Sequence, residues 1–189
     1  MNKLVVILTL FIVMVGCSTK VSRVETSSTM DLTGRWNDTD SRLVADELIR
    51  DCLSHTWLTK YDSILRKKPV VIVGKIENKS HEHISTETFV KDIQRALLNS
   101  GRVEFVADKN EREQIRDEKA DQASNASAPT AKSSGEESGA DLMMIGTINT
   151  IVDQEGKKAV VFYQTNMEMV EIESHKTVWI GENKIKKYV

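Results

Sequence analysis

The chain has 189 residues, of which 40% are hydrophobic and 29% are charged, and its formal net charge at pH 7 is -2. These values fit one soluble globular domain with extensions, and they exclude a strongly basic nucleic-acid-binding protein. Its two cysteines, Cys17 and Cys52, are too few for a fold supported by a disulfide framework.

The first sixteen residues predict a signal peptide. MNK carries one positive charge, the apolar run LVVILTLFIVMV follows, and Gly16-Cys17 closes the segment. An apolar run of about twelve residues is too short for a transmembrane helix but suits a signal peptide. The segment resembles the lipobox of bacterial lipoproteins, which implies lipidation of Cys17, and Ser18 after it is typical of sorting to the outer membrane. The alternative is a secreted protein with an incidental cysteine.

Residues 17–30 contain many Ser and Thr residues without apolar periodicity, which predicts a flexible arm that spans at most roughly 45 Å. A helix is expected from about 40 to 55, with Cys52 buried on its apolar face. Three residues at its start are good N-cap candidates, namely Thr39, Asp40 and Ser41.

The middle of the chain predicts two strands and two helices. The apolar run in 69–78 is typical of a central strand covered on both faces, and NKSHEHIS after it is a loop. A helix begins at Ser85 or Thr86 and ends before Gly101, and 103–107 form a strand. The charged stretch 109–121 predicts a solvated helix, and the Ser- and Ala-rich stretch 122–138 a flexible insertion.

The last third predicts three antiparallel strands. GADLMMIGTINTIV is a strand in which Gly146 allows a bulge or a close approach of another backbone. A turn at Glu155-Gly156 leads to the strand 158–172, and a turn near Ser174-His175 leads to TVWIGENKIKK. Together the elements predict an α+β (mixed α/β) domain over 31–189, with a small mixed β-sheet flanked by helices.

The pattern Asp38-Thr39-Asp40 is the first candidate for chemistry, because two carboxylates so spaced can hold a divalent metal in a transferase. The alternative is that both carboxylates lie at a helix N-terminus, where anions are favoured. His81-Glu82-His83 has no further ligand at metal-binding spacing and predicts a polar turn. Lys184, Lys186 and Lys187 predict a solvated strand edge.

Four segments together resemble the LpoB family of penicillin-binding protein activators: DLTGRWNDTDSRLVADELI, PVVIVGKIENKSHEHISTETFVKDIQRALLNSGRVEFV, SGADLMMIGTI and VVFYQTNMEMVEIESHKTVWIGENKIKK. The resemblance begins at about residue 31. Its most specific parts are GRWNDTDSR, the segment Trp179-Ile180-Gly181-Glu182, and Ile185-Lys186-Lys187.

The resemblance implies an outer-membrane lipoprotein that faces the periplasm and has no catalytic activity. The motifs themselves predict no cofactor and no metal. It implies binding to a class A penicillin-binding protein, at the regulatory domain between the glycosyltransferase and transpeptidase domains. The implied fold is similar to the N-terminal domain of TolB. Trp179 is either a core anchor or an exposed partner-binding residue.

Two features depart from the family pattern. The arm is short for crossing the periplasm, and 122–138 replaces a more regular helical stretch. The short arm keeps a second function open, that of a structural or assembly lipoprotein of an envelope complex. A metal-dependent transferase that uses Asp38 and Asp40 is a third.

Overall fold

The computed structural model describes residues 21–189, so the predicted signal peptide (1–16), Cys17 and the start of the arm lie outside the described residues. The helices are α2 (Asp38–Ser54), α3 (Thr56–Thr59), the π-helix η1 (Lys60–Leu65), α4 (Thr86–Asn99) and α5 (Lys109–Asn125). The strands are β1 (Val70–Asn78), β2 (Glu104–Phe105), β3 (Leu142–Glu155), β4 (Lys158–Glu171) and β5 (Thr177–Tyr188). Among these residues, no helix is long and apolar enough to cross a membrane.

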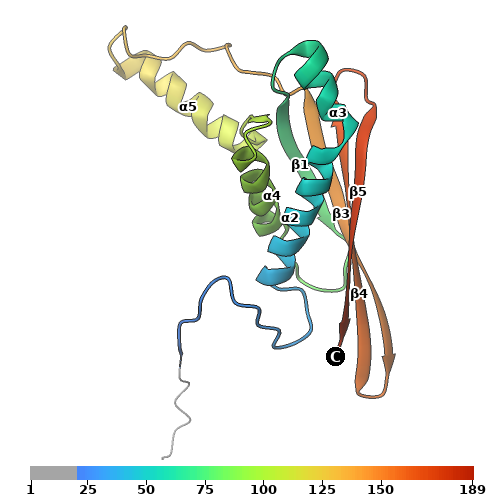
Figure 1. Cartoon of the computed structure of the whole chain (residues 1–189). Coiled ribbons are helices and arrows are strands. Elements are labelled where there is room, and N and C mark those ends of the chain that lie inside the picture. Colours follow the sequence, from blue (N-terminus) through green and yellow to red (C-terminus); the bar gives the residue numbers. More distant parts are fainter. Residues whose placement is uncertain (1–20) are drawn as a thin grey trace, which may run out of the picture.

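The five strands form one mixed sheet in the order β2-β1-β3-β4-β5. β1 is parallel to both of its neighbours, whereas β3, β4 and β5 pair as an antiparallel meander. The predicted α+β (mixed α/β) class and the meander are therefore confirmed. The β3–β4 hairpin is long, and its turn end projects beyond α2 (Figure 1).

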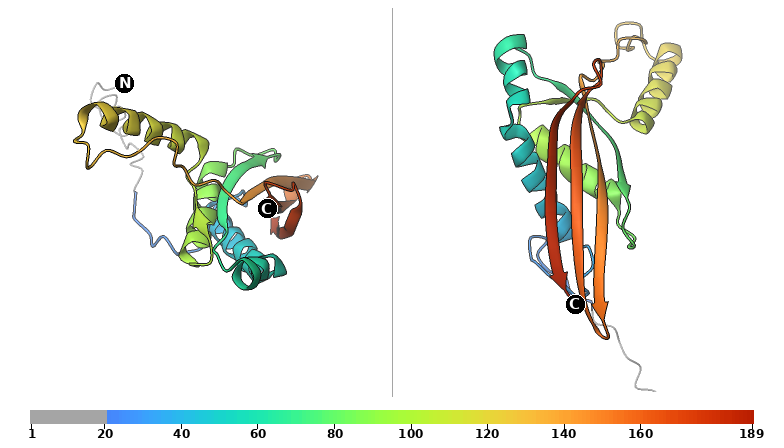
Figure 2. Two further views of the ribbon diagram at one scale, coloured as in Figure 1. Left: turned by 90° about the horizontal axis from the view of Figure 1, so that it is seen from above. Right: turned by 90° about the vertical axis from the view of Figure 1, so that its right-hand side faces the viewer.

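Helices α2 and α4 cover one face of the sheet, and the other face is open, as the right-hand view of Figure 2 shows. The expectation that β1 is covered on both faces is therefore wrong for its second half. Val71 and Val73 point into the core, but Lys75 is exposed and Glu77 is only half-buried. The prediction was wrong there because the apolar run extends only through the first half of the strand. In that half, Ile72 on the open face is also buried.

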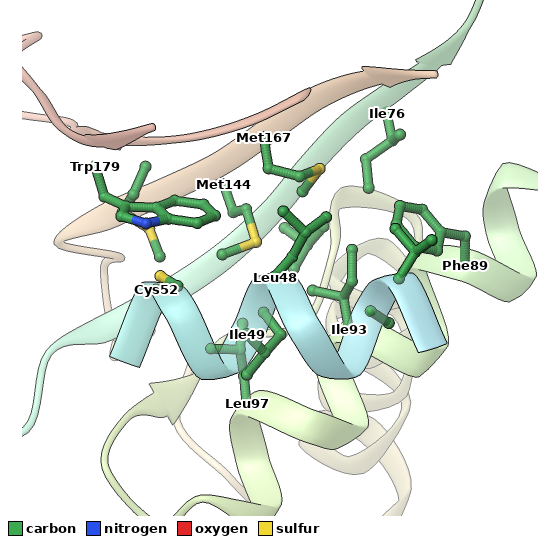
Figure 3. Packing of buried hydrophobic residues seen from close by; sticks show 14 of the residues in the cluster. Leu48, Ile49, Cys52, Ile76, Phe89, Ile93, Leu97, Met144, Met167 and Trp179 are labelled. Carbon is green, nitrogen blue, oxygen red and sulfur yellow. The ribbon is translucent and has the colours of Figure 1, made fainter. Parts of the chain in front are cut away.

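The core lies between the sheet and the two long helices. Leu48 and Cys52 of α2 face Met144, Met167 and Trp179 of the sheet (Figure 3). Each such large side chain, when fully buried, contributes about 1.5–3 kcal/mol of transfer free energy. The predicted apolar face of α2, with Cys52 buried on it, is confirmed.

Gly101 and Gly146 have the backbone roles that the sequence predicted for them. Gly101 follows α4 with φ of 66°, which suits the end of a helix. A Cβ on Gly146 would lie 2.5 Å from the Asn166 carbonyl oxygen, so this position is a close backbone approach. The bulge lies opposite, in β1, where the register with β3 shifts between Val73 and Ile76.

The charged helix α5 extends four residues beyond the predicted 109–121, because the start of the Ser- and Ala-rich stretch continues it. The predicted insertion 122–138 therefore begins within a helix. No residue of α5 is buried, as expected for a solvated helix. Strand β2 is shorter than the predicted 103–107.

Candidate partner-binding surface and the residues that shape it

The segment ahead of α2 forms a capping box. The Asp40 backbone N–H donates to Asn37 Oδ1 at 3.1 Å, and the Asn37 backbone N–H donates to Asp40 Oδ2 at 2.9 Å. The N-cap is therefore Asn37, two to four residues before the predicted Thr39, Asp40 or Ser41. The prediction failed because all these residue types can cap, and only the reciprocal bond to Asp40 selects Asn37.

Asp40 also joins the two ends of the domain. Lys187 Nζ on β5 donates to Asp40 Oδ2 at 2.6 Å, to Asp31 Oδ1 at 2.7 Å and to the Arg35 carbonyl oxygen at 3.1 Å. The Lys187 and Asp40 side chains are only 11% and 9% exposed. We call this group, Asp31, Asp40 and Lys187, the clasp. Lys187 was predicted on a solvated edge, which is wrong.

Gly34 adds a second contact between the segment before α2 and the C-terminal end of the sheet. Its φ is 65°, and an added Cβ would collide with the Val189 side chain. Val189 in turn pairs with Ala159 of β4 through two backbone hydrogen bonds of 2.8 and 2.9 Å. The segment before α2 is thus fixed against the end of the sheet, near the turn of the β3–β4 hairpin.

Glu82 in the loop after β1 connects three elements. Its Oε2 accepts from the Trp36 backbone N–H at 3.0 Å, and its Oε1 accepts from the Tyr163 hydroxyl at 2.7 Å. Burial and the hydrogen bond to Glu82 raise the pKa of Tyr163 above its usual range. His81 and His83 beside it are exposed. The segment is the predicted polar turn, and Glu82 has a structural role that its sequence context did not indicate.

Trp179 lies in the core and is only 3% exposed. Its indole Nε1 donates to Asp51 Oδ2 on α2 at 2.8 Å. Gly181, two residues later on the same face of β5, leaves room for the ring, since a Cβ there would lie 2.6 Å from Trp179 Cη2. The ring is the core anchor of the last strand; any contribution of Trp179 to partner binding would act through the shape of β5.

The residues considered as nucleophile or metal ligands, Cys52 and Asp40, have structural roles. Burial raises the pKa of the Cys52 thiol to about 12, so the thiol stays protonated at neutral pH. The Asp40 carboxylate is occupied by Lys187 and by the backbone of Asn37, as the capping alternative predicts. Within residues 21–189, no group of three or more His, Cys, Asp or Glu side chains is placed to hold a metal ion.

The open face of the sheet has a shallow hollow of about 310 Å³ over the β1 bulge, lined by Lys75, Ile145, Asn166 and Glu168 among others. On the same face, Ile180 of β5 is exposed next to Glu168. An apolar side chain on a surface that no helix covers is a candidate for contact with another protein.

A family model described as "Peptidoglycan-synthase activator LpoB" matches residues 40–185. The chain belongs to the LpoB family. The family is one of activators of peptidoglycan synthases, and the match begins at Asp40 in the first turn of α2 and ends at Ile185 of β5. Two of the most specific parts of the resemblance, GRWNDTDSR and Ile185-Lys186-Lys187, meet in space at the clasp.

Solved structures of LpoB domains and of another bacterial lipoprotein resemble this chain at low sequence identity. The C-terminal domain of LpoB from Escherichia coli is 13% identical, with 79% of this chain and 98% of that chain covered and a TM-score of 0.44. The Salmonella enterica domain is 14% identical, with coverages of 77% and 98% and a TM-score of 0.43. The lipoprotein GNA1162 from Neisseria meningitidis is 14% identical, with coverages of 64% and 83% and a TM-score of 0.41. No curated protein sequence gave a significant match.

Proposed function

We propose that this protein is a non-enzymatic outer-membrane lipoprotein that binds a class A penicillin-binding protein and activates it allosterically. The membership in the LpoB family over residues 40–185 carries the proposal. The protein is anchored by lipid on Cys17 and binds the regulatory domain between the glycosyltransferase and transpeptidase domains of the synthase.

Activation of this kind requires that the protein bind one conformation of the synthase more tightly than another. A tenfold rise in rate from a population shift corresponds to about 1.4 kcal/mol of differential affinity, which a modest interface can supply. The well-packed core and the clasp support this role, because a rigid binding surface loses little entropy when it docks.

The short arm limits how far the partner can be from the outer membrane. The clasp fixes the chain at Asp31, so an arm from Cys17 to Asp31 spans at most roughly 50 Å. The domain adds roughly 40 Å, the length of the 12-residue strand β5. The synthase must therefore present its regulatory domain within roughly 90 Å of the outer membrane.

The test is binding to, and stimulation of, purified class A penicillin-binding proteins from the source organism. The mature protein is expected to bind one of them and to raise its rate of glycan polymerisation. In cells, Cys17→Ser is expected to remove the protein from the outer membrane while leaving its domain folded. The proposal fails if no class A synthase binds the protein or changes its rate.

The short arm favours a second candidate, a structural or assembly lipoprotein of an envelope complex. In-cell cross-linking followed by mass spectrometry of the partners separates the two functions. A penicillin-binding protein among the partners supports activation, and an envelope complex without one supports assembly.

A further inference from the structure

The end of the domain farthest from the clasp has several features that the fold itself does not require. This end consists of η1, the residues 66–68 after it, and the turn 172–176 between β4 and β5; we call it the distal end. In Figure 1 it lies at the top, whereas the clasp lies at the bottom. The ten residue steps from Thr177 to Lys187 separate the two by roughly 33 Å.

The backbone of the distal end is unusual. Residues 60–65 form a π-helix, a conformation that is rare and often occurs at functional sites. The two non-glycine residues with positive φ in the described chain, Arg66 at 49° and His175 at 57°, both lie at this end. Such conformations are unfavourable for side chains other than glycine, and they cluster at binding sites.

Exposed apolar side chains lie on the same end. Ile64 is 75% exposed and Leu65 is 45% exposed, although both follow the buried Tyr61 on η1. Leu65 and Ile172 line a hollow of about 460 Å³ that has Tyr61 in its wall. Exposed aliphatic residues next to a hollow are typical of a protein-binding surface.

The charges around this hollow indicate what fits it. Two ion pairs lie in the wall, Lys60 with Glu171 at 2.7 Å and Lys67 with Asp141 at 2.8 Å, and the Glu173 carboxylate also lines the hollow. Arg66 and Lys68, beside the exposed Ile64 and Leu65, make no ion pair with another described residue. The part of the surface next to Ile64 and Leu65 is therefore complementary to an acidic group on a partner.

The point where the arm joins the domain determines which end of the domain faces away from the membrane. The clasp holds Asp31 at the end of the domain that also holds the β3–β4 hairpin turn. A partner located away from the membrane that anchors the arm therefore meets the distal end first, and the hairpin turn last.

We propose that the distal end is the surface that docks onto the synthase, and that it receives a protein surface with an apolar side chain beside an acidic group. This inference rests on the proposed function, because it assigns the docking surface of that interaction. The juxtaposition that carries it is Ile64 and Leu65 next to the unpaired Arg66 and Lys68, at the far end from the clasp.

Two pairs of variants of the mature protein test the proposal against the synthase that it binds. Ile64→Asp is compared with Ile151→Asp, which changes a similarly exposed isoleucine (67%) on the hairpin. Lys68→Glu is compared with Lys186→Glu, an exposed lysine at the clasp end of β5. Circular dichroism and the thermal midpoint verify that all four remain folded.

Ile64→Asp is expected to weaken binding at least tenfold and to abolish stimulation at the wild-type working concentration. Lys68→Glu is expected to weaken binding several-fold, with a smaller salt dependence than the wild type. The hairpin and β5 controls are expected to stay within about twofold of the wild type. A loss with Ile151→Asp but not with Ile64→Asp would overturn the docking surface while the proposed function stands. Unchanged binding in all four variants would also overturn the docking surface. If the wild-type protein binds no synthase, both the docking surface and the proposed function are overturned.

Discussion

Lys187 near the end of β5 lies 2.6 Å from the Asp40 carboxylate in the first turn of α2. The pair joins residues 147 positions apart and places a cation beside the carboxylate that completes the capping box. Because Asp31 binds the same ammonium, the pair also fixes the start of the domain. The clasp therefore determines where the arm leaves the folded domain.

Lys187→Met is expected to destabilise the domain. The Asp40 carboxylate would stay largely buried without its cation, and losing one partner of a buried pair costs about 3 kcal/mol or more. Urea unfolding followed by circular dichroism measures the change. Lys186→Met, on the exposed face of the same strand, is the matched control and is expected to change stability by less than about 0.5 kcal/mol. Equal midpoints for the two variants would contradict a stabilising clasp.

The unfolding free energy is expected to fall as the pH rises above about 10. Burial acts to lower the pKa of Lys187, but its hydrogen bonds to Asp31 and Asp40 outweigh it, so the pKa is raised. Burial raises the pKa of Tyr61 to about 12, with help from Asp141 and Glu171.

In the folded state, Lys187 and Tyr61 each keep a proton at a pH where the unfolded chain releases it. The stabilisation is therefore complete below the unfolded pKa near 10 and is lost as the pH rises through the folded pKa. Each group contributes a slope of at most about 1.4 kcal/mol per pH unit. Urea midpoints from pH 8 to 11 measure it, and Lys187→Met should fall less steeply. A stability that is flat or rises over this range would show that the assignment is wrong.

Gly181→Ala is expected to destabilise the domain by about 1–3 kcal/mol, the usual cost of overpacking a core. The new Cβ would overlap the Trp179 ring and push it away from Asp51. Gly139→Ala is the control, because a Cβ at Gly139 meets no atom within 4 Å. The NMR resonance of the Trp179 indole N–H, which donates to Asp51, reports whether the ring has moved. Similar stability of the two variants would mean that β5 shifts to accommodate the methyl group.

Removing the Tyr163 hydroxyl is expected to weaken the contact between β4 and the loop after β1. Tyr163→Phe leaves Glu82 Oε1 without its 2.7 Å donor, and a hydrogen bond to a charged group contributes about 1.5–3 kcal/mol. Tyr188→Phe is the control, because Tyr188 is 70% exposed on β5. Thermal midpoints of the two variants that agree within about 1 °C would indicate that solvent replaces the hydroxyl at Glu82.

Local patterns in the sequence predicted the parts of the fold that depend on local structure. The helical spacing of Leu48 and Cys52 located α2, and Gly156 located the β3–β4 turn. The alternation of side chains along β5 also indicates which way Lys187 points, because Lys187 shares a strand face with Trp179 and Gly181. Its partner Asp40 is 147 positions away, and no local pattern records such a pairing.

The distal end was less predictable for another reason. A π-helix and a left-handed arginine are conformations that the surrounding structure imposes on ordinary residues. The segment KYDSILR contains no glycine or proline that would indicate either one. Exposure of Ile64 follows from that local geometry, so the candidate docking surface could be found only in three dimensions.

Trp179→Phe separates a packing role from a partner-binding role for this residue. The smaller ring loses core contacts and the 2.8 Å hydrogen bond to Asp51, so a destabilisation of about 1–3 kcal/mol is expected. If Trp179 is only a core anchor, the affinity of the folded variant for the synthase stays within about twofold of the wild type. Trp36→Phe makes the same exchange at the clasp end and serves as the comparison for binding. An affinity that falls tenfold for Trp179→Phe alone, at a temperature where both variants are folded, would instead make β5 part of the interface.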